Sequence, residues 1–210
     1  MGFSFYICFL KIKNVCLQQK QNNMRKILVV VDVQKDFYHP DGALYVKGGE
    51  LLPEKLSKIM PQFDDIVFTL DYHPYNHCSF KDNGGIWPVH CVKGTEGSSL
   101  PNEFLSFLVE DSDFVYKGEF CDAEEYGANA HDLALSTFWG YTHDHDYLIV
   151  FCGIAGDYCV KETINNFIET FPADKDKVRV YLDGIASIDD GTTIKNYIKE
   201  NCIEEWKPQE

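Results

Sequence analysis

The stretch Ile27-Leu28-Val29-Val30-Val31-Asp32 decides the fold, because five apolar residues in a row end at a carboxylate. Such a run is too short for a helix and too uniformly apolar for a strand with one wet face. It therefore predicts a strand buried on both faces, as in a parallel sheet. Comparable runs follow at Ile66–Leu70, Phe114–Tyr116, Tyr147–Gly153 and Val178–Leu182.

Segments with the apolar spacing of helices separate or follow these runs. They are Leu52–Met60, a stretch around Ala128–Phe138, Tyr158–Thr170 and Thr192–Asn201. Strands that alternate with helices indicate an α/β fold. We expect a three-layer αβα sandwich with a mainly parallel, doubly wound sheet.

The length of 210 residues favours a single domain, which we place at 24–210. Residues 1–23 are expected to form a disordered extension. Their apolar run, Phe3–Leu10, has no basic residues before it and no small-residue cleavage site after it, and it is too short to span a bilayer. Met24 stands just before the first strand and is a second candidate start.

Composition excludes some classes of partner. The chain has 19 Lys and Arg against 33 Asp and Glu, a formal net charge of −14, which repels nucleic acid and anionic membrane surfaces. Its eight cysteines include no Cys-x-x-Cys pair, and the chain is longer than a small disulfide scaffold. We therefore expect reduced thiols in a cytoplasmic protein. The sequence leaves open whether the chain forms a homo-oligomer.

Reactive side chains follow the predicted strands at the edge where an open α/β sheet binds its ligands. They are Asp32, Asp71 with His73, Lys117, and the segment Gly153–Cys159. Together these residues offer a carboxylate, metal ligands, an ammonium group and a thiol.

Cys159 is the candidate nucleophile, because it follows a Gly-containing turn where a helix is predicted to begin near Tyr158. Free N–H groups at a helix N-terminus stabilise a thiolate and lower the pKa of the thiol. The peptide N–H groups of Ala155 and Cys159 are candidates for an oxyanion hole. The alternative for any cysteine is a buried structural role, which we assign to Cys152 within the strand.

Asp32 and Lys117 can serve that nucleophile from neighbouring strand ends. A carboxylate in this place can take the thiol proton and later protonate the leaving amine. A lysine can stabilise the thiolate and the developing oxyanion. Considered alone, Asp32 could be a loop-capping residue and Lys117 a solvated lysine. The combination with Cys159 is suited to acyl transfer.

Asp71 and His73 have the spacing of two metal ligands on the same face of an extended chain. His90 would complete a set of two histidines and one carboxylate that leaves coordination positions open, as a catalytic divalent ion requires. His77 is a candidate fourth ligand. The alternative for each histidine alone is a surface or hydrogen-bonded residue.

The ordered motifs resemble those of the nicotinamidases and pyrazinamidases, a branch of the isochorismatase-like hydrolases. They are Asp32–Phe37, Asp71–His73, Asn76–Phe80, Trp87–Cys91, Gly94–Gly97, Tyr116–Gly118 and Gly153–Val160. The resemblance runs from about Lys26 to Leu182. The first and last motifs occur throughout the superfamily, whereas Asp-x-His and Trp-Pro-x-His-Cys are typical of the nicotinamidase branch.

This resemblance implies hydrolysis of nicotinamide, and of pyrazinamide, to the acid and ammonia through a cysteine thioester, in NAD salvage. The implied catalytic triad is Asp32, Lys117 and Cys159. The implied metal ligands are Asp71, His73 and His90, and His77 ligates the metal in some members of the family and not in others. Zinc is the expected ion, with manganese and iron as alternatives.

The resemblance also implies the substrate pocket. The metal would bind the pyridine nitrogen of nicotinamide, and Phe37 and Trp87 would pack against the ring. The Ile154–Ala155 peptide would be cis.

The chain departs from the family after Lys117. Many relatives have Ser-Gly-Phe or Ser-Ala-Phe there, whereas residues 119–127 read Glu-Phe-Cys-Asp-Ala-Glu-Glu-Tyr-Gly. Tyr126 is a candidate for the missing aromatic surface of the pocket. Two other functions stay open: a superfamily hydrolase acting on a carbamoyl or isochorismate-type substrate, and a catalytically silent metal-binding protein on the same fold.

Overall fold

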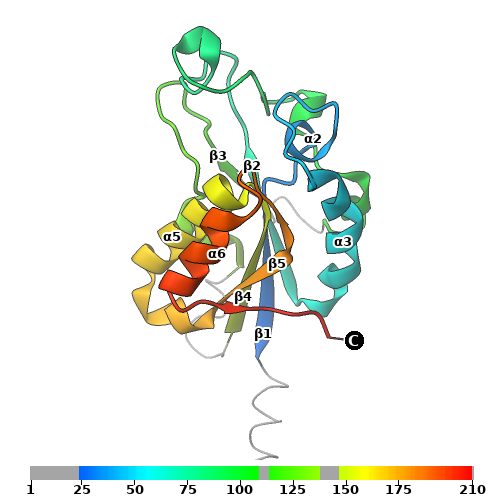
Figure 1. The fold of residues 1–210 in the computed structure, drawn as a ribbon, viewed down its shortest axis with the longest axis vertical. Coiled ribbons are helices and arrows are strands. Elements are labelled where there is room, and N and C mark those ends of the chain that lie inside the picture. The colour runs from blue at the N-terminus through cyan, green and yellow to red at the C-terminus, as the bar shows by residue number, and fades with distance from the viewer. Residues whose placement is uncertain (1–23, 109–113, 138–146, 210) are drawn as a thin grey trace, which may run out of the picture.

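The computed structural model describes residues 24–108, 114–137 and 147–209 (Figure 1). Within them, six strands form one sheet in the order β3-β2-β1-β4-β5-β6, and every neighbouring pair is parallel. The strands are β1 (Arg25–Val31), β2 (Asp65–Asp71), β3 (Phe114–Lys117), β4 (Tyr147–Ile154), β5 (Val178–Ala186) and β6 (Glu204–Glu205). The predicted extension, residues 1–23, lies outside the described residues.

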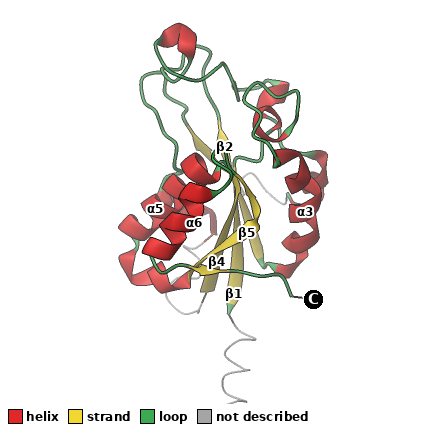
Figure 2. Ribbon diagram, in the orientation of Figure 1, coloured by secondary structure: helices red, strands yellow, loops and turns green. Residues whose placement is uncertain are grey.

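Helices cover both faces of this sheet, as Figure 2 shows, with α3 on one side and α5 and α6 on the other. The helices are α2 (Lys35–Tyr38), α3 (Leu52–Ile59), α4 (Ala130–Thr137), α5 (Lys161–Thr170) and α6 (Thr192–Glu200). The predicted three-layer αβα sandwich with a doubly wound parallel sheet is confirmed. None of the helices in the described ranges has the length and apolar character needed to cross a membrane.

Strand β1 shows why the central strands are apolar throughout. Ile27, Val29 and Val31 belong to the core beneath α5 and α6, whereas Leu28 and Val30 belong to the core beneath α3. Each of these side chains is at most 1% exposed. Successive side chains of a strand point to opposite faces, so a strand between two helical layers needs apolar residues at every position.

Three local features differ from the sequence prediction. The helix expected from Tyr158 begins with a π-helical turn at Gly156–Val160, and α5 follows from Lys161. Strand β6 was not predicted, because its two residues are exposed glutamates. Helix α2 is four residues long and carries no helical periodicity that a sequence could display.

The order of the strands fixes the place of the binding site. From β1 the chain adds β2 and β3 on one side, and from β4 it adds β5 and β6 on the other. β1 and β4 are hydrogen-bonded neighbours, so their carboxyl ends form the topological switch point of the sheet. Ligands of open α/β sheets bind in the crevice at this point.

Candidate active site

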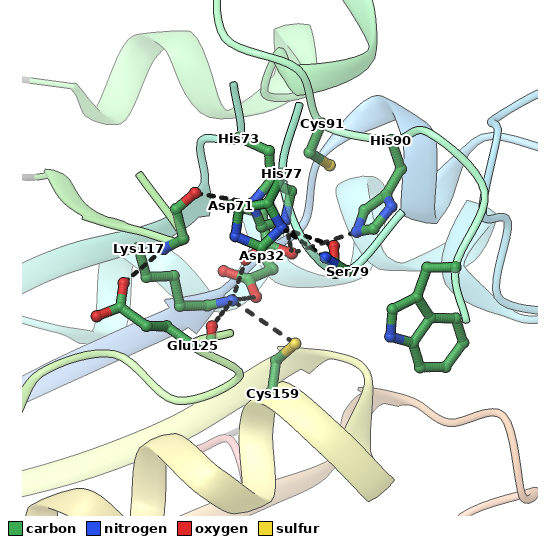
Figure 3. Close-up of polar contacts among 12 residues, drawn as sticks. Asp32, Asp71, His73, His77, Ser79, His90, Cys91, Lys117, Glu125 and Cys159 are labelled. Atoms are coloured by element: carbon green, nitrogen blue, oxygen red, sulfur yellow. Dashed lines mark hydrogen bonds and ion pairs between the residues drawn. The ribbon is translucent and has the colours of Figure 1, made fainter. Parts of the chain in front are cut away.

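Lys117 lies at the centre of the charged groups at the switch point (Figure 3). Its Nζ atom is 2.8 Å from Asp32 Oδ2 and 3.7 Å from Cys159 Sγ, and it also pairs with Asp71 Oδ1. Carboxylate oxygens of Asp32 and Asp71 and the Cys159 sulfur all lie within 4.8 Å of one another. The structure thus brings together the three residues predicted as a triad.

Strand register explains this convergence. Asp71 and Lys117 are the last residues of β2 and β3, and they are register partners. Asp32 follows β1, and its carboxylate accepts a hydrogen bond of 2.7 Å from the Thr69 hydroxyl on β2. Cys159 lies in the π-helical turn after β4. Four parallel strands therefore deliver four functional groups to one point.

All four side chains are at most 7% exposed, so charge on each of them depends on its neighbours. Burial acts to lower the pKa of Lys117, but the Asp32 and Asp71 carboxylates outweigh it and raise that pKa well above its usual value. Burial also acts to raise the pKa of Asp71, but Lys117, His73 and His90 hold it well below the usual range. A buried ammonium next to an ionised Asp71 is the stable arrangement.

Asp32 differs from Asp71 in the direction of its pKa. Burial raises the pKa of Asp32, the Asp71 carboxylate adds to this increase, and Lys117 opposes it. A carboxylate with a raised pKa is a stronger base than an ordinary aspartate. Asp32 is thus equipped to exchange a proton, whereas Asp71 is equipped to remain an anion.

The prediction of a helix-lowered pKa for Cys159 is wrong in direction. Burial raises the pKa of this thiol, the Asp32 and Asp71 carboxylates add to the increase, and the opposing Lys117 ammonium does not cancel it. The sequence showed the helix start but not that the sulfur would be buried beside two carboxylates. The resting side chain is therefore a thiol that needs a base.

Asp71, His73 and His90 form a second group, whose ligand-type atoms also lie within 4.8 Å of one another. The Nε2 atoms of His73 and His90 are 3.4 Å and 3.8 Å from Asp71 Oδ2. His73 Nδ1 donates to the Gly118 carbonyl at 2.9 Å, and His90 Nδ1 donates to the Pro88 carbonyl at 2.8 Å.

Those two hydrogen bonds decide how well the group suits a metal. A nitrogen that faces a carbonyl must carry a proton, so each ring in its neutral form keeps its lone pair on the Nε2 atom that faces Asp71. Metal-binding histidines are usually held by such a bond on the other ring nitrogen. The donor set of two imidazoles and one carboxylate therefore fits a divalent ion with open coordination positions.

Asp71, His73 and His90 are called the metal-type group below. A hollow of about 410 Å³, a volume that includes the space at its open entrance, is lined by Cys159 and by Asp71 and His90 of this group. Each residue predicted to contact the ring or to form the oxyanion hole is in its wall, namely Phe37, Trp87, Ala155 and Cys159. Tyr126 and Tyr158 add aromatic surface, and the Trp87 indole N–H donates to the Tyr126 hydroxyl at 3.0 Å. The Ile154–Ala155 peptide is cis, as the resemblance implied.

Sequence reasoning missed several residues that hold or line the site, among them Gln34 and Glu124. Gln34 grips the backbone of Asp71, because its side chain accepts from the Asp71 N–H and donates to the Asp71 carbonyl, both at 2.8 Å. Glu124 lines the hollow, and burial together with the Asp71 carboxylate raises its pKa. Gln34 stands in the first quoted motif, so its place beside Asp32 was the available signal.

Relatives with known activities settle the family. No family model matches the chain. The nicotinamidase of Saccharomyces cerevisiae is 34% identical, over 83% of this chain and 94% of the relative. The chain belongs to the nicotinamidase family. The family expected from the motifs is thereby confirmed.

Solved structures of other nicotinamidase-family proteins agree with this assignment. The pyrazinamidase of Pyrococcus horikoshii in complex with zinc has a TM-score of 0.71 and 28% identity, over 87% of this chain and 99% of that chain. The yeast nicotinamidase bound to the inhibitor nicotinaldehyde has a TM-score of 0.70 and 29% identity, over 87% of this chain and 100% of that chain. This nicotinamidase-family chain therefore matches them over nearly their full length.

Proposed function

We propose that this chain is a nicotinamidase that hydrolyses nicotinamide to nicotinate and ammonia, and pyrazinamide in the same way, in the salvage of nicotinamide for NAD. One observation carries the proposal: the Lys117 ammonium joins the Asp32 carboxylate and the Cys159 thiol at the switch point, beside the group Asp71, His73 and His90. A nucleophile, a base and a cation in contact are the requirements of acyl transfer.

In the first step Asp32 accepts the proton of the Cys159 thiol while the sulfur attacks the carboxamide carbon. Both groups have raised pKa values, so the proton moves toward a carboxylate that binds it more readily than an ordinary aspartate would. Lys117 stays charged throughout. It stabilises the negative charge on the sulfur as the proton is removed, and then the negative charge that develops on the carbonyl oxygen of the substrate.

In the second step the tetrahedral intermediate collapses. Ala155 and Cys159 border the hollow, and their peptide N–H groups are the proposed donors to the oxyanion. Asp32 returns its proton to the amide nitrogen and the C–N bond breaks. Ammonia departs, and a thioester remains on Cys159. Water then attacks the thioester with Asp32 as the base, giving nicotinate and the free thiol.

Asp71, His73 and His90 would hold a divalent ion, and we propose zinc, with manganese or iron as alternatives. When bound, the ion supplies a Lewis-acid position that takes the pyridine nitrogen and so orients the ring. Phe37 is buried against the His90 ring at a centroid distance of 5.4 Å, and Trp87 also lines the hollow. Both side chains would pack against the heterocycle.

The direct test is to incubate the purified, zinc-loaded chain with nicotinamide and to measure ammonia and nicotinate together. We expect the two products in equal amounts, and loss of both after removal of the metal with a chelator. Carbamoyl and isochorismate-type substrates are assayed in parallel. Turnover of one of these in place of nicotinamide would favour the rival hydrolase, and zinc binding without binding of nicotinamide would favour the silent protein.

A further inference from the structure

His77 lies between the metal-type group and the segment Glu119–Gly127 in which this chain departs from its family (Figure 3). Its side chain is fully buried. The ring packs on the His73 ring at a centroid distance of 4.1 Å and an interplanar angle of 34°. The position alone would suit either a fourth metal ligand or a residue that supports the others.

The hydrogen bonds of His77 decide between these roles. Its Nδ1 atom accepts from the Ser79 peptide N–H at 3.3 Å and lies 2.7 Å from the Ser79 hydroxyl. The ring proton is therefore on Nε2, which donates to the Ala123 carbonyl at 2.9 Å. Each ring nitrogen is used, and neither offers a lone pair to an ion.

The Ala123 contact ties the divergent segment to the ligand motif. The same segment accepts a hydrogen bond of 2.8 Å from the Cys78 N–H at the Cys121 carbonyl. Two residues that follow Ala123 in the chain, Glu124 and Tyr126, form part of the wall of the substrate hollow. Glu124 and Tyr126 are only one and three residues from Ala123. Loss of the hydrogen bond between His77 and Ala123 is therefore expected to shift this part of the pocket wall.

We propose that His77 is a positioning residue, which fastens Glu119–Gly127 over the active site and so sets the part of the pocket wall that carries Glu124 and Tyr126. A buried hydrogen bond to a main-chain carbonyl is suited to this task, because Glu124 and the neighbouring Glu125 are exposed and hydrogen bonds fix the path of the segment. Its other anchors include the bond from the Cys78 N–H to the Cys121 carbonyl and the bond from the Gly118 N–H to the Glu125 carboxylate, both at 2.8 Å. A bound divalent ion would then have Asp71, His73 and His90 as its protein ligands.

The test compares His77→Phe, which keeps a ring beside His73 and removes the hydrogen bonds to Ser79 and Ala123, with His77→Gln, whose side-chain amide can still donate to Ala123. Hydrogen exchange of peptides spanning residues 118–127 reports on the segment independently of catalysis. We expect exchange at least about fivefold faster in His77→Phe and largely restored protection in His77→Gln. Zinc affinity should stay within about threefold in both variants, whereas His73→Ala should lose zinc.

Kinetics form the second readout, which rests on the proposed function. In His77→Phe we expect the KM for nicotinamide to rise by about five- to tenfold with kcat within about twofold. A loss of zinc affinity of tenfold or more in a folded His77→Phe protein would overturn the proposal, as would unchanged exchange at 118–127. Absence of turnover in the unmodified chain would refute the proposed function alone, because the exchange and zinc results would still decide the role of His77.

Discussion

The two walls of the active site are built differently. The strand wall consists of Asp32, Asp71, Lys117 and Cys159, which are at most 7% exposed and are fixed by the register of parallel strands. The loop wall consists of Trp87, Glu124 and Tyr126, which are partly or largely exposed and belong to no regular element. Rigid elements hold reacting groups more accurately than loops do, whereas loops vary with the ligand.

This contrast gives each wall an expected signature. Changes in the strand wall should lower turnover or stability by large factors, because buried charges lose partners. Changes in the loop wall should mainly raise KM, because they loosen contacts to the ring. If variants of the two walls had the same effects on kcat, KM and stability, this difference between the walls would be contradicted.

The largest effect is expected for Cys159→Ala, which removes the nucleophile. We expect ammonia release from nicotinamide to fall by at least about 10⁴-fold, because the residual rate would come from binding and oxyanion contacts alone. Cys152→Ala is the matched control. It is a buried cysteine on β4, the strand that precedes the turn with Cys159; its sulfur lies 3.6 Å from the Val29 carbonyl, and burial alone raises its pKa.

The control should keep its kcat within about threefold while it loses some stability. Equal losses of activity in Cys152→Ala and Cys159→Ala would show that the assay reports folding, and undiminished activity in Cys159→Ala would remove this residue as the nucleophile.

The next largest effect is a loss of stability in Lys117→Met, because the Lys117 ammonium is the shared partner of two buried carboxylates. Lys117→Met leaves Asp32 and Asp71 buried without their shared cation, and breaking a buried pair in this way costs about 3–5 kcal/mol. Urea unfolding of the metal-free protein measures this free energy. Lys58→Met, which breaks an exposed pair with Glu54, should leave the free energy of unfolding nearly unchanged. Equal losses of unfolding free energy in the two variants would mean that the buried ion pairs of Lys117 do not contribute to stability.

Gly118 links the strand wall to the metal-type group, and Gly118→Ala should weaken metal binding. This residue has a φ of +64°, and a Cβ there would lie 2.3 Å from Cε1 of His73. Displacing His73 should cost about 10- to 100-fold in zinc affinity, the range seen when the support of a ligand is lost. Zinc affinity is measured by competition with a chelator.

Gly84→Ala separates this clash from backbone strain. Gly84 has a φ of +94°, but a Cβ there would meet nothing within 4 Å. Both variants should lose stability through their positive φ, by about 1 kcal/mol. Weak zinc binding in both would show that strain, and not contact with His73, is responsible.

The strand wall could be predicted from the sequence because apolar runs mark buried strands and parallel strands end at one edge. Asp32, Asp71 and Lys117 were found by reading the residue at each strand end. The direction of the Cys159 pKa could not be found in this way, because it depends on burial beside two carboxylates contributed by other strands. Whether His77 ligates a metal was equally hidden, because its partner Ala123 is 46 residues away.

The loop wall was less accessible to prediction for a related reason. Phe37 and Trp87 were expected in the pocket from the family resemblance, and both line it. Periodicity carries no information about segments such as Glu119–Gly127, whose path is set by single hydrogen bonds to distant residues. Tyr126 was recognised as a candidate from its aromatic character, but its contact with Trp87 could be seen only in the folded chain.

That contact gives the smallest expected effect and the finest test of the comparison. The Trp87 indole N–H donates to the Tyr126 hydroxyl at 3.0 Å, and both rings pack on Tyr158. Tyr126→Phe removes the acceptor and keeps the ring, Trp87→Phe removes the donor, and the double variant completes a cycle.

A hydrogen bond between neutral side chains contributes about 1 kcal/mol, so each single variant should raise KM by about three- to fivefold with kcat nearly unchanged. The double variant should be less impaired than the product of the two single effects, because either change alone already breaks the bond. Strictly additive effects would mean that the two residues contact the substrate independently, and a fall in kcat equal to the rise in KM would place the loop wall in the reacting machinery together with the strand wall.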